Sequence, residues 1–324
     1  MPHDVTSPGG PGRLPPHEAR KLTGHATTLS VGVALTLVVA KLAAFLASGS
    51  IALLASLADS GLDLAASLTT FFAVRYAAAP ADREHRFGHG KAEAAASVLQ
   101  ALLVGASAAY LFWEAGQRLS DPEPVRHGGW AITVMMLSVV LTIVLVWVQT
   151  RAIRKTGSVA VSGDRAHYVA DLGANFSVIA GITLAAFFGV TRADPIIAIL
   201  VALWLLWSAW GVATHALDHL LDKELPDAER QRIKDIALAD DRILGIHQLR
   251  TRAAGPLVHI QFHADLNPDL SLLAAHEIIV EAENRLMAEY PAADVLIHAD
   301  PKGRAEPHGS DFFRSEAART EDSA

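Results

Sequence analysis

The run PIIAILVALWLLWSAWGVATHAL, from Pro195 to Leu217, contains no Asp, Glu, Lys or Arg. An α-helix needs ~20 consecutive apolar residues to cross the hydrocarbon core of a bilayer, so this run predicts a transmembrane helix. Five further runs are similarly long and apolar: Thr27–Ser48, Ile51–Ala78, Ala92–Leu119, Trp130–Thr150 and Val169–Val190. The sequence therefore predicts an α-helical membrane protein with six transmembrane helices, which agrees with a hydrophobic content of 51%.

Composition limits the chemistry and the partners. The chain has no cysteine, so disulfides and thiolate metal sites are excluded, and imidazole and carboxylate groups would have to hold a metal ion. The formal net charge is −7 and there is no basic stripe, which argues against a nucleic-acid partner. The first apolar run is longer than the ~7–15 residues of a signal-peptide core, which predicts a retained helix.

Lys and Arg are distributed unevenly among the predicted loops. One set of loops and the N-terminal segment carry most of them: Arg13, Arg20, Lys21, Arg75, Arg83, Arg86, Lys91, Arg151, Arg154, Lys155 and Arg165. The opposite loops carry Arg118, Arg126 and Arg192. Because positively charged loops remain in the cytoplasm, we expect a multipass protein with both termini on the cytoplasmic side.

The pattern changes between Pro226 and Asp300. It predicts a small cytoplasmic α+β domain of order αββαβ, with helices Asp227–Ala239 and Ser271–Tyr290 and strands Ile243–Arg252, Leu257–Asp265 and Val295–Ala299. The second strand alternates apolar side chains with His259, Gln261 and His263, so one sheet face belongs to the core and the other carries imidazoles. The predicted organisation is a disordered leader (1–21), a transport domain (22–222), this domain (223–301) and a disordered tail (302–324).

Two pairs of ionisable residues lie inside predicted transmembrane helices. Asp59 and Asp63 are four residues apart, and so are His167 and Asp171, which places each pair on one helical face. A charged side chain at the bilayer centre costs ~2.5–3.5 kcal/mol, so these residues indicate function. A single one could still be a polar side chain bonded to a neighbouring helix.

Three carboxylates and one imidazole form a four-ligand set suited to zinc and tolerable for ferrous iron or cadmium. A bound divalent cation favours deprotonated ligands, so metal and protons compete for the same groups. The two pairs lie at matching depths only if the fifth helix begins before Val169, near Ser158.

These residues resemble the transport motif of the cation diffusion facilitator family, most closely its bacterial ferrous-iron and zinc efflux members. The resemblance extends from about Leu22 to Pro301. It implies a second metal site on the loop between the second and third helices, at Asp82, His85 and His89, where spacing alone would suggest a solvated loop. It also implies that Lys91 and Asp222 belong to a charge pair that interlocks the third and sixth helices across a homodimer, where pattern alone would suggest unrelated interfacial residues.

The resemblance further implies a binuclear metal site in the C-terminal domain, near the interface of a homodimer. The matching residues, which pattern alone would assign to ordinary polar surface, are His247, His263, His276, His298 and Asp300. The family match predicts proton-coupled efflux of a divalent metal, zinc, ferrous iron or cadmium, across the bacterial inner membrane, by a transporter and not an enzyme. Two alternatives remain: a membrane-anchored metal sensor, and an intramembrane metalloenzyme, although no H-E-x-x-H motif is present.

Overall fold

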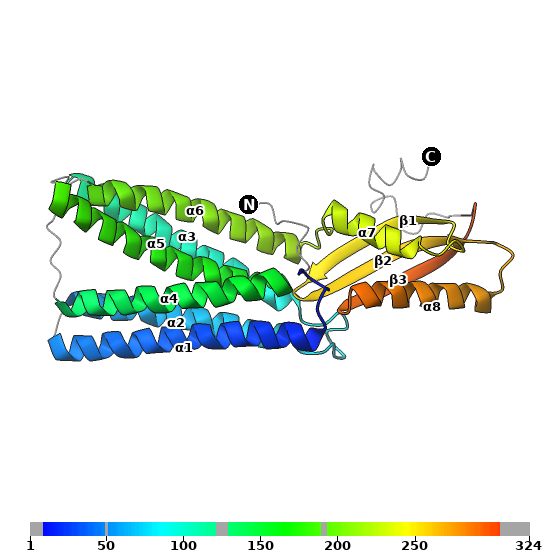
Figure 1. Ribbon diagram of the computed structural model, residues 1–324, viewed down its shortest axis with the longest axis horizontal. Coiled ribbons are helices and arrows are strands. Elements are labelled where there is room, and N and C mark those ends of the chain that lie inside the picture. Colours follow the sequence, from blue (N-terminus) through cyan, green and yellow to red (C-terminus); the bar gives the residue numbers. More distant parts are fainter. Residues whose placement is uncertain (1–8, 49–50, 121–128, 189–192, 305–324) are drawn as a thin grey trace.

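The computed structural model describes residues 9–48, 51–120, 129–188 and 193–304. Its first part is a bundle of long helices: α1 (Pro16–Ser48), α2 (Ile51–Ala77), α3 (Lys91–Ser120), α4 (Gly129–Thr156), α5 (Val159–Phe188) and α6 (Ala193–Leu220). A smaller α+β domain extends from one end of the bundle (Figure 1). The predicted fold class, a helical membrane domain followed by an α+β domain, is confirmed.

Five of the described helices are long and apolar enough to cross a membrane, namely α1, α2, α3, α4 and α6. The exception, α5, has 30 residues but carries Asp164, Arg165, His167 and Asp171 near its start. It packs against α3, α4 and α6 within the same bundle. Helix α5 therefore places these ionisable side chains among the neighbouring helices of the bundle.

The start of α5 is fixed by two hydrogen-bonding side chains. Gly157, at φ 66, separates α4 from α5, and the Ser158 hydroxyl accepts a hydrogen bond from the Val161 amide at 3.3 Å. Glu93 of α3 accepts from the Ser158 hydroxyl at 2.5 Å and from the Ala160 amide at 3.4 Å. The beginning of α5 at Val159 agrees with the start near Ser158 that the depths of the ionisable pairs predicted.

The prediction of a disordered leader is wrong for residues 9–21. Gly12 donates its amide to the Pro256 carbonyl at 2.9 Å, and the Arg13 guanidinium lies 4.4 Å from the centre of the Tyr290 ring. Helix α1 already begins at Pro16, a residue whose fixed φ suits the first helical position. Tertiary contacts thus order a segment whose composition suggested disorder, while residues 1–8 and 305–324 lie outside the described residues.

The α+β domain contains α7 (Asp227–Ala237), β1 (Gly245–Ala254), β2 (Leu257–Leu266), α8 (Leu272–Glu289) and β3 (Ala293–Pro301). Strand β2 is central, antiparallel to β1 and parallel to β3, as the αββαβ order requires. Its alternating apolar residues join residues of both helices in one buried core: Ile233, Val258, Ile260, Phe262, Ile278 and Leu286. The opposite, imidazole-bearing face of the sheet is therefore available for polar contacts.

Several contacts connect the α+β domain to the helix bundle. Lys91 of α3 lies 3.0 Å from the Asp222 carboxylate, so the charge pair that the resemblance implied forms within one chain. Arg252 of β1 contacts the same carboxylate at 3.1 Å. Phe87, in the α2–α3 loop, packs edge-on against the His259 ring of β2, with ring centres 5.7 Å apart. The loop that carries the second predicted metal site thus rests against the sheet.

Candidate metal centres

The first candidate centre lies between α2 and α5. Asp63 Oδ1 and His167 Nε2 are 2.9 Å apart, and both side chains are buried. Asp171 follows His167 by one helical turn, and ligand atoms of Asp63, His167 and Asp171 all lie within 4.8 Å of one another. Two carboxylates and one imidazole thereby converge inside the helix bundle, which is a donor set that zinc accepts.

Asp59 lies one turn before Asp63 on α2 and is exposed. It is not part of the group whose ligand atoms lie within 4.8 Å. Asp59 and Asp63 are separated by one turn, ~6 Å along the helix. The structure therefore brings three of the four predicted ligands together, and the role of Asp59 stays a prediction.

The second candidate centre lies on the α2–α3 loop. Asp82 Oδ1 is 3.3 Å from His85 Nδ1, and Asp82 Oδ2 is 3.2 Å from His89 Nε2. The His89 ring is buried and packs against Tyr76, with ring centres 4.5 Å apart. All three predicted residues are thus in contact, although two of them are exposed.

Local backbone geometry favours the ionised form of the Asp82 carboxylate. Its Oδ1 accepts hydrogen bonds from the backbone amides of His85, at 2.6 Å, and Glu84, at 2.9 Å. The hydrogen bond from the His85 amide is the main cause that holds the pKa of Asp82 below its usual value. The carboxylate is therefore ionised at neutral pH without a bound metal.

The third candidate centre lies on the polar face of the sheet. His247, His263 and His298 are direct register partners on β1, β2 and β3, so they form one row across the strands. Asp300 Oδ2 is 2.9 Å from His263 Nδ1 and 3.3 Å from His247 Nε2, and Asp300 Oδ1 is 3.1 Å from His298 Nε2. One buried carboxylate thus contacts three imidazoles.

The environment of His263 favours neutral imidazole, the form that binds metal. Burial lowers the pKa of His263, partly opposed by its hydrogen bond to Asp300. Both ring nitrogens of His247 are buried without a hydrogen bond, although Nε2 lies 3.3 Å from Asp300. A cation bound to neutral His247 would use the lone pair of its unprotonated ring nitrogen.

One predicted member of this centre lies elsewhere, and one contact was missed. His276 is exposed on α8 and is not among the residues whose ligand atoms the described structure brings together. Asp265 lies two residues after His263 on the same strand face, and its Oδ1 is 3.6 Å from His247 Nε2. The period of two along β2 was the signal that could have identified it.

Comparison with known proteins identifies the family of the chain. Residues 27–221 match the cation efflux transmembrane domain, and residues 225–302 match the cytoplasmic domain of cation efflux proteins. The chain belongs to the cation efflux family. This membership confirms the resemblance to the cation diffusion facilitators, which was based on the spacing of the two ionisable pairs.

Relatives in the cation efflux family match nearly the full length. The cation-efflux pump FieF of Shewanella oneidensis is 44% identical over 276 residues, which cover 85% of this chain and 93% of that protein. FieF of Cronobacter sakazakii is 40% identical over 285 residues, which cover 88% of this chain and 95% of that protein.

A solved structure of CzrB in its zinc form matches a smaller part of the chain. It is 32% identical and covers 26% of this chain and 99% of its own, with a TM-score of 0.25.

Proposed function

We propose that this protein exports a divalent transition-metal cation across the bacterial inner membrane in exchange for protons. The observation that carries the proposal is the convergence of Asp63, His167 and Asp171 between two helices of the membrane domain. Burying ionisable side chains in that environment costs free energy, so their presence there indicates a function. Membership of a family of cation efflux proteins supports the same reading, and it favours a transporter over an enzyme.

The ligand set favours zinc as substrate. Imidazole suits zinc, iron and copper, while carboxylate oxygens broaden the choice toward harder cations. We therefore propose zinc as the preferred cargo, with ferrous iron and cadmium as alternatives, and Asp59 as the fourth ligand when the ion is bound.

Proton exchange follows from the chemistry of the same ligands. An imidazole and clustered carboxylates can each bind a proton, whereas a divalent cation requires their deprotonated forms. Metal that enters from the cytoplasm would displace protons, and protons from an acidic exterior would displace the metal. The proton gradient would then supply the free energy for export.

The other two centres fit regulation. We propose that the loop residues Asp82, His85 and His89 and the sheet residues His247, His263, His298 and Asp300 bind cytoplasmic metal in a homodimer, with His276 completing the sheet site. Binding there stabilises one arrangement of the α+β domain over others and so adjusts transport. Both termini would lie in the cytoplasm, as the distribution of Lys and Arg indicates.

The test is zinc uptake into proteoliposomes with an imposed pH gradient. We expect Asp63→Asn to reduce zinc flux at least about a hundredfold, because one ligand loses its charge at the site where the ion is held. Asp241→Asn, the same chemical change at an exposed position of the α+β domain, should leave the flux unchanged.

Two results would contradict the proposal. Undiminished zinc flux in Asp63→Asn would remove the transport site. Zinc binding without any flux in the unaltered protein would favour the alternative of a membrane-anchored metal sensor.

A further inference from the structure

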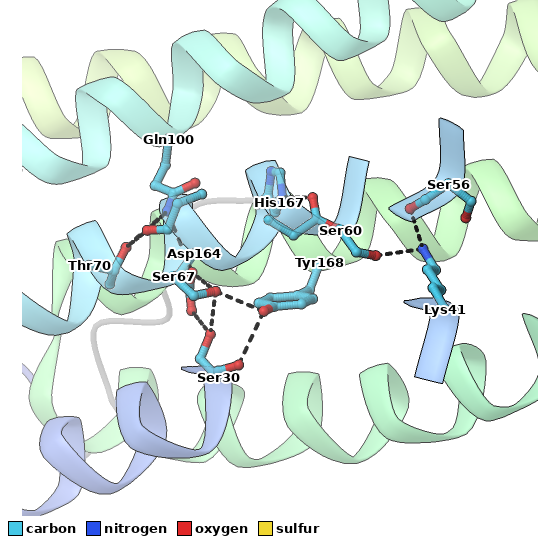
Figure 2. Close-up of polar contacts among 12 residues, drawn as sticks. Ser30, Lys41, Ser56, Ser60, Ser67, Thr70, Gln100, Asp164, His167 and Tyr168 are labelled. Atoms are coloured by element: carbon cyan, nitrogen blue, oxygen red, sulfur yellow. Dashed lines mark hydrogen bonds and ion pairs between the residues drawn. The ribbon is translucent and has the colours of Figure 1, made fainter. Parts of the chain in front are cut away.

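A second polar cluster lies next to the transport site, on the side of the α+β domain. Its centre is Asp164, three residues before His167 on α5, which is ~4.5 Å along the helix. Figure 2 shows Asp164 grouped with side chains from neighbouring helices on one side of His167, while Lys41, Ser56 and Ser60 lie on the other. We call this group the Asp164 cluster; its members are Ser30, Ser67, Gln100, Gln149, Asp164 and Tyr168.

The Asp164 carboxylate connects five helices. It accepts hydrogen bonds from Ser30 of α1 at 2.6 Å and from Gln149 of α4 at 2.8 Å. Longer contacts of 3.5 Å reach Ser67 of α2 and Gln100 of α3. These helices and α5 are therefore held together at one level by a single side chain.

The same cluster fixes the residue next to His167. The Tyr168 hydroxyl is 2.7 Å from Ser67 Oγ and donates to the Ser30 carbonyl at 3.3 Å. The rings of His167 and Tyr168 meet edge to face, with centres 5.9 Å apart. The rotation of α5 at the transport site is thus coupled to whether the cluster is intact.

Exposure rises from the cluster to the transport site, where Asp63 and His167 are 9% and 7% exposed. Every member of the Asp164 cluster is at most 1% exposed. Asp171 of the transport site is partly exposed, and Asp59, further from the α+β domain, is exposed. The transport site is therefore closed on the side of the α+β domain by a layer of packed, hydrogen-bonded side chains.

A layer of this kind suits an opening and closing role. A buried carboxylate is stable only while its donors stay in place, so separating the helices requires the hydrogen bonds to break together and water to enter. The open state would in turn expose a carboxylate to an arriving cation. An apolar layer of the same shape would offer neither property.

We propose that the Asp164 cluster is the inner seal of the transport pathway, which closes the transport site toward the α+β domain and must separate to admit a metal ion from that side. This inference rests on the proposed export function and adds to it a set of positioning residues. Asp164 acts through helix packing and does not hold the metal.

The absence of cysteine makes the seal directly testable by thiol labelling. Ser97 of α3 is fully buried, its hydroxyl lacks a hydrogen-bond partner, and it packs against Gly163, next to Asp164. Ser97→Cys is therefore a mild reporter at the level of the seal. Ser138→Cys on α4, a buried position toward the opposite end of the bundle, serves as a second reporter.

The experiment adds a membrane-impermeant methanethiosulfonate to the full-length protein in vesicles, on the side of the α+β domain. We expect Asp164→Asn to speed labelling at position 97 about tenfold, the factor that corresponds to one lost hydrogen bond to a charged group. Labelling at position 138 should not change, because the seal and not the whole bundle is weakened. The matched control is Ser177→Ala, a buried α5 position outside the cluster that should leave both rates unchanged.

An unchanged labelling rate at position 97 in Asp164→Asn would overturn the seal, and so would an equal increase at both reporters, which would mean general loosening. If Asp164→Asn does not fold, Ser30→Ala removes one donor and should raise the rate at position 97 by a smaller factor. Labelling requires no transport. Zinc flux that survives Asp63→Asn would therefore refute the assigned transport site without deciding the seal.

Discussion

Asp240 and Asp241 are neighbours in sequence between α7 and β1, yet they differ in environment. Asp240 accepts two hydrogen bonds from the Arg242 guanidinium, at 2.7 and 2.9 Å, and a longer one from Arg285 at 3.3 Å. The guanidinium of Arg242 lowers the pKa of Asp240 below its ordinary value of 3.8. Asp241 is exposed, which makes it a matched control.

We expect Asp240→Asn to destabilise the α+β domain by about 1 kcal/mol at neutral pH. Because the folded pKa is depressed, the unfolded state binds more protons, so this contribution is present above pH 3.8 and is lost as pH falls below it. Amide hydrogen exchange of β1 and α8, compared between variants at the same pH, measures the difference. An effect that Asp241→Asn reproduces, or that persists undiminished in acid, would contradict the assignment.

Spacing predicted the grouping of Asp63, His167 and Asp171 better than that of their polar neighbours. The i, i+4 pairs identified Asp63, His167 and Asp171 because four residues return a helix to the same face. Asp164 was not recognised, although it lies three residues before His167 on an adjacent part of that face. Its hydrogen-bond donors come from separate helices, so the cluster forms only when the helices pack and cannot be read from spacing within one helix.

At the scale of elements, the beginning of α5 was predictable and the N-terminal segment was not. The depth of the transport residues requires α5 to start near Ser158, because helix rise per residue is fixed. By contrast, Arg13 forms ion pairs with Glu229 and Glu289 of the α+β domain. The composition of a Pro- and Gly-rich leader does not indicate ion pairs with residues more than two hundred positions away in sequence.

The cap of α5 gives a prediction at this scale. Ser158→Ala removes the hydroxyl that the Val161 amide and the Glu93 carboxylate both contact, which should cost about 1 kcal/mol. We expect faster amide exchange in the first turn of α5, while exchange in α8 stays the same. Thr27→Ala is the control, because its buried hydroxyl bonds the Thr23 and Gly24 carbonyls within α1. If the first turn of α5 exchanged its amide hydrogens equally slowly in Ser158→Ala and in the unaltered protein, the capping role would be contradicted.

At the scale of the whole molecule, the order of domains and the αββαβ pattern were readable from hydrophobic periodicity. The contacts between domains were not. Periodicity records which face of an element is buried but not which other element covers it. The packing of Phe87 against His259 is such a contact.

The separation of transport and regulation is testable in the intact protein. We expect His263→Ala to weaken zinc binding at the sheet site at least about tenfold. Loss of a group that only hydrogen-bonds to a metal ligand already lowers metal affinity by about that factor, and loss of the ligand itself should lower it further. Basal zinc flux should persist, since the residues of the transport site are unchanged. Gln261→Ala, two residues away on the same strand face, is the control. Loss of all flux in His263→Ala alone would contradict a purely regulatory role.

Anomalous diffraction at the zinc edge, from crystals of the full-length protein grown with zinc, tests the central claim most directly. The account predicts a zinc peak inside the helix bundle, about 2.0–2.2 Å from a carboxylate oxygen of Asp63, a ring nitrogen of His167 and a carboxylate oxygen of Asp171. Zinc peaks confined to the α2–α3 loop and the sheet, with none between α2 and α5, would contradict it.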